Sequence, residues 1–422
     1  MSGSVFRDAH MVISRRHFLR SSATFAAATL ASPAIFTRGA FGQEDPILVG
    51  SLHDQSGPIA ASGVPMVESL NLGISEVNAA GGLLGRPLKL VHYDTQSNIQ
   101  MYSQYAQQLA VRDKVAVVHG GITSASREAV RPTFSRFRTL YFYNTLYEGG
   151  VCDRNTFCTG TTPAQTVEKL VPYAMGKSGK RVYIIAADYN YGQITAKWMQ
   201  KYVKDHGGET LSVDFFPLDV TNFGPTISKI QAAKPDLILS ALVGGNHTAF
   251  YRQWASAGMK SQIPIASTTF GLVNEPSTLD AAESDGIIGA YGYFEELTTP
   301  ASTAYVGALK KASPSIPYIS ELACGTYEGF HLWAEAVKKA GTIERMAVIE
   351  ALETGLSFDG PSGKVTIDHP THHTTRNAYL ADVKERKWNV LETYTDAKPL
   401  DTAAVCDLVK NPGDNKQYEI SI

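Results

Sequence analysis

The 422-residue sequence lacks the features that would mark it as a nucleic-acid-binding, zinc or integral membrane protein. Its 38 basic and 40 acidic residues give a formal net charge of only −2, so nucleic acid is not expected as a partner. It has four cysteines, and no cysteine and histidine spacing matches a zinc site. The apolar run from Ala23 to Ile35 is too short to span a membrane.

Catalytic motifs are also missing. There is no Gly-x-Ser-x-Gly elbow, no His-Glu-x-x-His and no Walker loop. Glu148 with Asp188 or Glu295 could act as an acid and base pair, but nothing in the sequence sets their distance. The histidines between residues 369 and 373 could bind a metal, although loop histidines are more often solvent-facing or hydrogen-bonded. We therefore expect a protein that is not an enzyme and holds no cofactor and no metal.

The first 42 residues are typical of an export signal. Arg15 and Arg16 lie in the string S-R-R-H-F-L-R, a mildly apolar run follows, and Ala40-Phe41-Gly42 is a plausible cleavage site. Residues 1–42 are thus predicted to be a twin-arginine signal peptide, which directs the chain to the periplasm. After cleavage we expect no membrane insertion.

The cysteines leave two interpretations open. Cys152 and Cys158 are close enough in sequence to close a small disulfide loop in an oxidising compartment. Alternatively, all four cysteines, including Cys324 and Cys406, are independent thiols.

From Pro46 onward, short β-rich runs alternate with segments of helical periodicity. This pattern predicts parallel sheets covered by helices on both faces, an α/β fold of two doubly wound, Rossmann-like lobes joined by three crossovers. The N-terminal lobe is predicted to comprise residues 46–162 and 294–356, and the C-terminal lobe residues 163–293 and 357–400. Residues 401–422 have little periodicity and are predicted to be a C-terminal surface tail.

Two local motifs concern helix ends. The glycine-rich run at 78–87 follows a helix and precedes a strand, the reverse of the order in a phosphate loop, so Gly81 is interpreted as a helix C-terminal cap with positive φ. Thr162, followed by Pro163 and Gln165, is typical of a capping box and predicts a helix start there. Ser124 or Ser126 is expected to cap the helix that contains Arg127.

Polar side chains collect directly after the predicted strands. In doubly wound sheets this edge binds ligands. The residues concerned are mostly hydroxyl-bearing: Ser56, Ser124, Tyr143, Thr145, Glu148, Tyr189, Tyr191, Thr268 and Thr269.

Several of these motifs together resemble a known family. They are the run from Asn78 to Arg86, Ser124 to Val130, Tyr147-Glu148-Gly149, Thr159 to Gln165, Asp188 to Tyr191 and Gly360 to Asp368. Residues 46–400 are similar to the solute-binding proteins of the branched-chain amino acid ABC transporter class, in particular to their urea and short-chain amide branch. The resemblance implies the type I periplasmic binding protein fold, or Venus flytrap. It also implies a small-molecule ligand between the lobes and an inner-membrane ABC permease as partner.

The resemblance also implies the ligand contacts. Ser124, Tyr143 and Thr145 would hold the ligand from the first lobe, with Tyr191 and Tyr189 closing from the second. Amino-acid binders of this class usually hold the ligand ammonium with a carboxylate near the positions of Thr268 and Thr269, where this chain carries only hydroxyls. An unpartnered buried ammonium costs about 3 to 5 kcal/mol, so a neutral, amide-like ligand is predicted, although Glu148 or Glu295 could supply a partner.

The sequence departs from the urea pattern at Ile122, Asn144 and Gly192. Ile122 stands where the family usually has an aromatic side chain, so one wall of a small, flat pocket is missing and a larger amide becomes plausible. Three alternatives remain: an amino-acid binder, an amide sensor that signals to a regulator, and an amide hydrolase.

Overall fold

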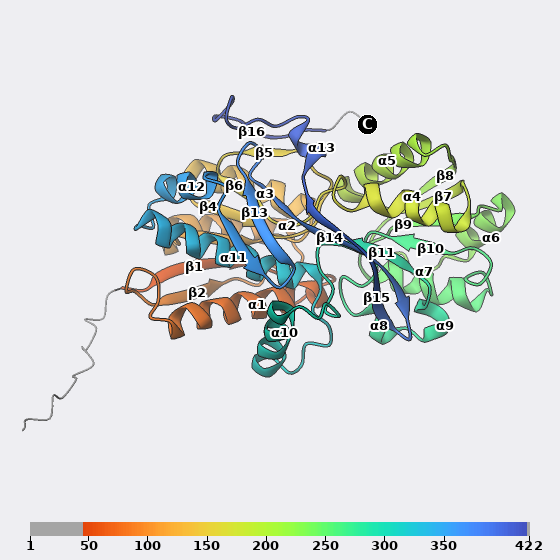
Figure 1. Ribbon diagram of the computed structural model, residues 1–422, viewed down its shortest axis with the longest axis horizontal. Coiled ribbons are helices and arrows are strands. Elements are labelled where there is room, and N and C mark those ends of the chain that lie inside the picture. Colours follow the sequence, from red (N-terminus) through yellow and green to blue (C-terminus); the bar gives the residue numbers. More distant parts are fainter. Residues whose placement is uncertain (1–44, 420–422) are drawn as a thin grey trace, which may run out of the picture. The chain divides into compact units, whose positions relative to one another are not determined.

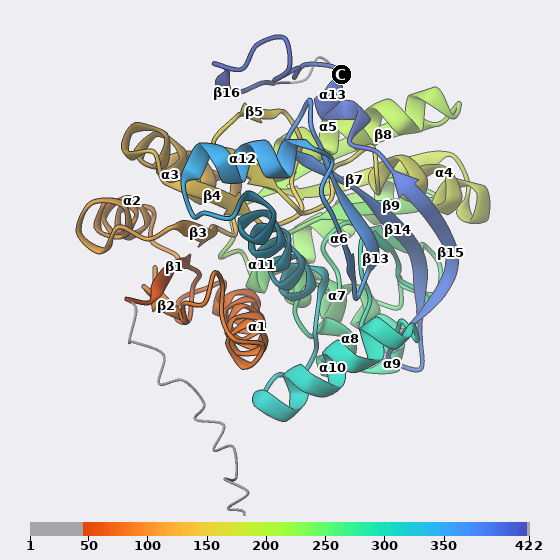
Figure 2. The ribbon, with the colours of Figure 1, turned by 60° about the vertical axis from the view of Figure 1, so that its left-hand side comes forward.

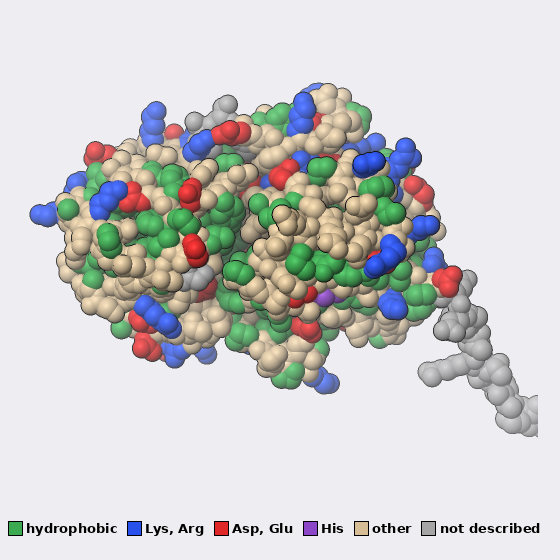
Figure 3. Space-filling model, turned by 180° about the vertical axis from the view of Figure 1, so that it is seen from behind, with side chains coloured by type: hydrophobic (Ala, Val, Ile, Leu, Met, Phe, Trp, Pro, Cys, Tyr) green, Lys and Arg blue, Asp and Glu red, His purple; other side chains and the backbone are tan. Residues whose placement is uncertain are grey.

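The computed structural model describes residues 45–419. The predicted twin-arginine signal peptide, residues 1–42, lies outside this range. Among the described helices, none combines the length and the apolar character that a membrane crossing requires. On the face shown in Figure 3, basic and acidic side chains are interspersed rather than grouped by sign.

The first lobe is built on a five-stranded parallel sheet with the order β2-β1-β3-β4-β6 (Figure 1). Its strands are β1 (Ile47–Leu52), β2 (Leu88–His92), β3 (Val117–Gly120), β4 (Leu140–Tyr143) and β6 (Thr156–Cys158). Its helices are α1 (Ala60–Ala79), α2 (Ile99–Gln107) with the π-helix η1 (Gln108–Asp113), α3 (Ser124–Phe137), α11 (Glu321–Ala340) and α12 (Arg345–Glu353).

Apolar side chains cover both faces of this sheet. Leu70 of α1 and Trp333 of α11 pack with Phe142 on one face, whereas Phe134 of α3 packs with Tyr141 on the other. Figure 2 shows α1 and α11 side by side on one face, with α2 and α3 on the opposite side. The alternation of buried strands and amphipathic helices in the sequence is thus realised as a three-layer lobe.

The second lobe is built on a larger, mixed sheet with the order β12-β13-β14-β11-β10-β9-β7-β8, and β15 pairs with β14. Its parallel strands are β7 (Arg181–Ala187), β8 (Glu209–Phe216), β9 (Leu237–Ala241), β10 (Ile265–Ser267) and β11 (Ile288–Tyr291). The antiparallel strands are β12 (Ser357–Gly360), β13 (Gly363–Asp368), β14 (His373–Lys384) and β15 (Lys387–Ala397).

The helices of this part follow the same alternation. They are α4 (Val167–Ser178), α5 (Asn190–Asp205), α6 (Gly224–Ala233), α7 (Gly245–Ser256), α8 (Glu275–Thr278) and α9 (Ala281–Ser284). The next helix, α10 (Pro300–Ala312), packs instead on the first lobe, where Tyr305 contacts Ser69 of α1. The chain passes between the two sheets after β6, after β11 and along β14, so the predicted fold with three crossovers is confirmed. The predicted C-terminal lobe included β13, yet Val365 and Ile367 of this strand pack with the core of the first lobe. The exact lobe boundaries therefore stay predictions.

The C-terminal part differs from the predicted surface tail. Residues 400–419 form α13 (Leu400–Ala403) and β16 (Asn415–Gln417), and β16 pairs with the short strand β5 (Val151–Asp153). A disulfide joins Cys152 to Cys406, while Cys158 and Cys324 are free and buried. Neither interpretation of the cysteines was right. Elements of three or four residues have no detectable periodicity, and a partner 254 residues away cannot be inferred from spacing.

Two helix starts also need correction. Thr123 caps α3, because its Oγ1 accepts a hydrogen bond from the amide of Ser126; neither Ser124 nor Ser126 is the cap. The α4 helix begins at Val167 rather than at Thr162. Gln165 does accept from the Thr162 amide, but the Thr162 hydroxyl donates to Asp401 instead of capping. Gly81 has φ of +103°, as predicted.

Candidate ligand-binding site

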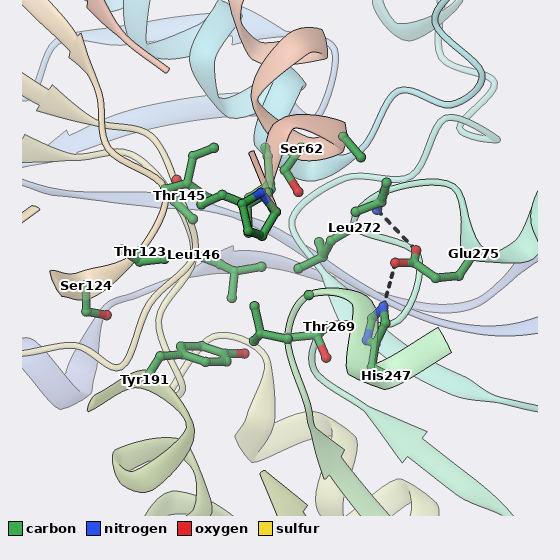
Figure 4. Close-up of a pocket in the computed structure, with 18 of the residues that line it drawn as sticks. Ser62, Thr123, Ser124, Thr145, Leu146, Tyr191, His247, Thr269, Leu272 and Glu275 are labelled. Carbon is green, nitrogen blue, oxygen red and sulfur yellow. Dashed lines mark hydrogen bonds and ion pairs between the residues drawn. The ribbon is translucent and has the colours of Figure 1, made fainter. Parts of the chain in front are cut away.

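A cavity of about 250 Å³ is lined by residues of both lobes. It lies at the carboxyl ends of the strands, where doubly wound sheets bind ligands. Its volume is many times what one ordered water needs. Most of its lining surface is apolar, and the apolar residues include Ile59, Ala61, Ile122, Leu146, Val243, Leu272, Val273 and Leu322. Figure 4 shows polar side chains at several points around these apolar walls.

Six of the nine predicted site residues line this cavity: Ser124, Tyr143, Thr145, Tyr189, Tyr191 and Thr269. The other three lie elsewhere. Thr268 is behind the wall, where its hydroxyl accepts from Tyr191 at 2.9 Å. Glu148 is buried and bound to Ser124, and Ser56 is exposed and donates to Asp94 at 2.6 Å.

The hydroxyl hydrogens of this wall point away from the cavity. Tyr143 donates to the carbonyl of Ile122 at 2.8 Å, and Thr145 donates to the carbonyl of Gly121 at 3.1 Å. Ser124 donates to the carboxylate of Glu148 at 2.5 Å. Carbonyl and carboxylate oxygens cannot donate, so each hydrogen must sit on the hydroxyl.

The second lobe repeats this arrangement. Thr269 donates to the carbonyl of Leu242 at 2.6 Å, and Tyr191 donates to Thr268. Each of these hydroxyls therefore offers lone pairs, and not a hydrogen, to a ligand. Such a wall favours a ligand that brings N–H or O–H donors of its own.

Three helix N-termini reach the same cavity. Ser62 of α1, His247 of α7 and Thr123, the N-cap of α3, belong to its lining. At α3, Thr123 satisfies the amides of Ser126 and Arg127, which leaves the two amides before them without a partner among the described residues. Free amides and the helix dipole favour a carboxylate or carbonyl oxygen at this end.

An ion pair that the sequence reasoning missed lies on the second-lobe side. His247 Nε2 is 2.6 Å from Glu275 Oε1, and both side chains are buried in the cavity wall. Glu275 Oε2 accepts from the amides of Gly271 at 2.9 Å and Val273 at 3.1 Å. Burial would raise the pKa of Glu275, but the charge of His247 and these hydrogen bonds hold it below the ordinary value, so Glu275 is an anion. Figure 4 shows the pair on one side of the cavity, away from Ser124.

The positions of these two residues carried a signal. His247 and Glu275 both lie in segments that directly follow strands, β9 and β10, which is the edge where ligands bind. The predicted site residues ended at Thr269 in the second of these segments and included none from the first, because only residues close to each predicted strand end were considered.

The first-lobe wall is backed by a buried arginine. Arg127 Nη2 donates to Glu148 Oε1 at 2.9 Å, and its guanidinium lies 5.0 Å from the ring centre of Tyr143 and 4.5 Å from that of Tyr147. Burial alone would lower the pKa of Arg127, but the carboxylate of Glu148 raises it well above the ordinary value. Arg127 and Glu148 therefore form a fixed, charged support beneath the cavity.

The other candidate groups have structural partners. Asp188 and Glu295 do not line the cavity, so they form no acid and base pair with Glu148 there. His372 lies 3.1 Å from Glu353, and His373 contacts Thr371 and Tyr147. In residues 45–419, no cluster of three or more histidine, cysteine or carboxylate side chains has metal-binding geometry.

Comparisons with known proteins show the family and the fold of the chain. A sequence model of the family described as periplasmic binding protein matches residues 46–387. The chain is 24% identical over 348 residues to Leu/Ile/Val-binding protein homolog 6 of Brucella abortus (strain 2308), covering 80% of this chain and 88% of the relative. It is 25% identical over 388 residues to homolog 7 of Brucella suis biovar 1 (strain 1330), covering 87% and 96%.

Solved structures share the fold. A solute binding protein of an ABC transporter from R. palustris, in complex with 4-hydroxybenzoate, has a TM-score of 0.77 at 24% identity and covers 84% of this chain and 98% of its own. The branched-chain amino acid transporter substrate binding protein LivJ from Streptococcus pneumoniae, in complex with isoleucine, has a TM-score of 0.74 at 20% identity and covers 83% and 99%.

Proposed function

Because the chain belongs to the periplasmic binding protein family, we propose that it is the substrate-binding protein of an ABC importer and carries a small solute to a membrane permease. The ligand would occupy the cavity between the lobes. The closed state would be favoured because the second lobe then adds contacts, such as those of Tyr191 and Thr269, that an open state lacks. The protein would bind its solute without transforming it.

The ligand is proposed to be an α-amino acid with an apolar side chain. The observation that carries this choice is the roomy cavity with apolar walls, which suits an apolar side chain, while its hydroxyls accept hydrogen bonds and so call for a ligand with N–H donors. The amides at the start of α3 would bind the carboxylate, and the apolar walls would bind the side chain. The names of the Brucella relatives, and the isoleucine bound to the pneumococcal protein, support the same class.

Glu275 removes an argument against this class. The prediction of an amide ligand rested on the loop after β10, where Thr268 and Thr269 offer hydroxyls but no carboxylate for a ligand ammonium. Glu275, farther along the same loop, lines the cavity as an anion and could partner an ammonium. The ammonium and His247 would then both contact the carboxylate of Glu275, whose negative charge His247 already offsets in part.

A urea or short-chain amide is the second candidate. An amide also combines N–H donors with a carbonyl acceptor, so it suits the same hydroxyls and helix amides. The size and the apolar walls of the cavity favour the larger amino acid. A benzoate matches the accepting hydroxyls less well, because its carboxylate brings acceptors only.

A ligand panel tests the proposal. L-leucine, L-isoleucine, 4-hydroxybenzoate, acetamide and urea would each be added to the purified protein, with the melting temperature and calorimetric affinity as readouts. We expect the amino acids to raise the melting temperature most, because ligand bound only by the folded state stabilises it. A larger shift with acetamide or urea would favour the second candidate, and release of ammonia would point to an enzyme.

We propose that the protein is exported to the periplasm, because it belongs to the periplasmic binding protein family and because residues 1–42 are predicted to be a signal peptide. Replacing Arg15 and Arg16 by lysine in the full chain should keep the protein in the cytosol, as judged by cell fractionation. If the variant still reaches the periplasm, the twin-arginine route is wrong. A mature wild-type chain found only in the cytosol would instead favour the role of an amide sensor.

A further inference from the structure

The C-terminal segment, residues 406–419, is fastened to the first lobe at successive points. The disulfide from Cys152 to Cys406 fixes its beginning. Strand β16 then pairs antiparallel with β5, and the amide of Tyr418 donates to the carbonyl of Gly150 at 2.8 Å. This segment therefore runs beside the loop that carries Glu148, the residue that holds the cavity hydroxyl of Ser124.

Gln417 joins this segment to the buried arginine. Its Oε1 accepts from Arg127 Nη2 at 2.8 Å, and its Nε2 donates to the carbonyl of Gly149 at 2.7 Å. The amide side chain thus bridges helix α3 and the 148–150 loop. It also reaches across 290 residues of sequence to do so.

The contact with Gln417 is one of three hydrogen bonds that orient Arg127, whose Nε also donates to Glu128 Oε1 at 2.8 Å. Its Nη2 carries two hydrogens, and they go to Gln417 and to Glu148. Its Nη1 is buried and has no hydrogen-bond partner among the described residues. Without Gln417, a fully buried guanidinium would keep one fewer hydrogen bond to fix its plane.

The chain of contacts ends in the cavity. Glu148 accepts from Arg127 through Oε1 and from Ser124 through Oε2, at 2.9 and 2.5 Å. A change in the position of Arg127 would move the carboxylate, and with it the hydroxyl that lines the cavity.

The same region also touches the second lobe. Trp198 of α5 donates to the carbonyl of Glu148 at 3.3 Å, and Lys197 forms an exposed ion pair with Glu419. An exposed pair contributes little energy, so the half-buried contact of Gln417 with the buried Arg127 carries the argument.

We propose that Gln417 is a positioning residue for ligand binding: through Arg127 and Glu148, the C-terminal segment fixes the Ser124 hydroxyl at the cavity wall. The inference rests on the proposed function, because it takes the cavity as the ligand site. It assigns to the C-terminal segment a role in affinity as well as in stability.

Three variants of the full chain test this role. Gln417→Met keeps the length of the side chain and removes both polar contacts. Gln417→Glu keeps an acceptor for Arg127. Lys416→Ala, at the exposed neighbouring position of β16, is the matched control.

The first readout is hydrogen exchange without any ligand. Gln417→Met should raise exchange at the amides around Ser124 and Arg127 and in the loop around Glu148, whereas Lys416→Ala should not. Gln417→Glu should return the exchange toward wild type. Equal exchange in wild type and Gln417→Met at these amides would overturn the proposal.

The second readout is calorimetric binding of L-leucine. Gln417→Met should weaken it between about twofold and thirtyfold, the range for residues that act on a site through a network. Unchanged affinity, despite faster exchange, would reduce Gln417 to a structural role and would also overturn the proposal. If L-leucine does not bind the wild type, the proposed ligand is wrong, and the exchange experiment alone then decides whether Gln417 positions the wall.

Discussion

The two halves of the cavity are supported in different ways. On the first-lobe side, the hydroxyl of Ser124 is backed by Glu148 and Arg127, and these in turn by Gln417 from the far end of the chain. On the second-lobe side, Glu275 is held by amides two and four residues away and by His247. The first half therefore depends on long-range contacts, whereas the second is built almost entirely from its own loops.

This difference determines what each half can contribute to binding. Glu148 is fully engaged with Arg127, so the first half presents hydroxyls and helix amides but no available charge. Glu275 is bound by His247 and by the amides of Gly271 and Val273, but unlike Glu148 it lines the cavity. We therefore expect charge recognition from the second half and hydrogen-bond geometry from the first.

The sharpest way to test this division is Glu275→Gln. The amide keeps an acceptor for the backbone but removes the negative charge, so an ammonium would lose its partner, at a cost of about 3 to 5 kcal/mol. We expect the affinity for L-leucine to fall at least a hundredfold in calorimetry. Glu209→Gln, at an exposed position of β8, is the control. A fall in affinity below tenfold would mean that Glu275 does not bind the ligand ammonium.

The second test concerns the long-range support of the first half. Cys406→Ser removes the disulfide to Cys152, and the free energy of unfolding should fall by about 2 to 5 kcal/mol. Urea unfolding would measure this. A reductant should lower the stability of the wild type toward that of the variant and leave the variant itself unchanged. Wild-type protein that is insensitive to the reductant would argue against this anchor.

The third test uses the pH response of Asp401 in α13, close to the disulfide at Cys406. Asp401 accepts from the Thr162 hydroxyl and the Ala164 amide where the chain first crosses between lobes, and burial raises its pKa to about 6. The folded state thus holds this proton more tightly than the unfolded state does. The stabilisation is fully present below the ordinary pKa of about 3.8 and is lost as the pH rises through 6.

The measurement is urea unfolding of wild type and Asp401→Asn between pH 4 and pH 7. The stability of wild type relative to the variant should fall by about 2 kcal/mol across this range. Other titrating groups, such as His373, whose pKa burial lowers to about 3, contribute equally to both proteins and cancel. A difference that is independent of pH would show that Asp401 is not protonated in the folded state at pH 4.

The halves also differ in how far the sequence could predict them. Alternating strands and helices predicted the two-lobed fold, which the structure confirms. Strand-end positions and the family resemblance predicted Ser124, Tyr143 and Thr145 as residues of one wall. Whether these residues bind ligand remains a prediction.

What the sequence could not supply are contacts between distant positions. Glu148 was predicted at the site, yet its carboxylate is turned inward to Arg127, a pairing set by the packing of α3. Glu275 lies in the wall because the loop after β10 folds back through its amides. The role of Gln417 depends on a disulfide and a three-residue strand, which leave no pattern along the chain.

The smallest expected effect compares one hydroxyl from each half. Thr145→Val and Thr269→Val each keep the shape of the side chain and remove one acceptor from the cavity wall. Each should weaken L-leucine binding about tenfold, the loss expected for one unpaired ligand hydrogen. The affinity for acetamide should fall by a similar factor, because the same N–H donors are involved. Calorimetry with both ligands measures the effects.

An equal loss in the two variants would mean that hydrogen bonding is shared between the halves and that only charge is divided. A loss confined to Thr145→Val would assign the N–H contacts to the first half, and unchanged affinity in both variants would remove these hydroxyls from the site.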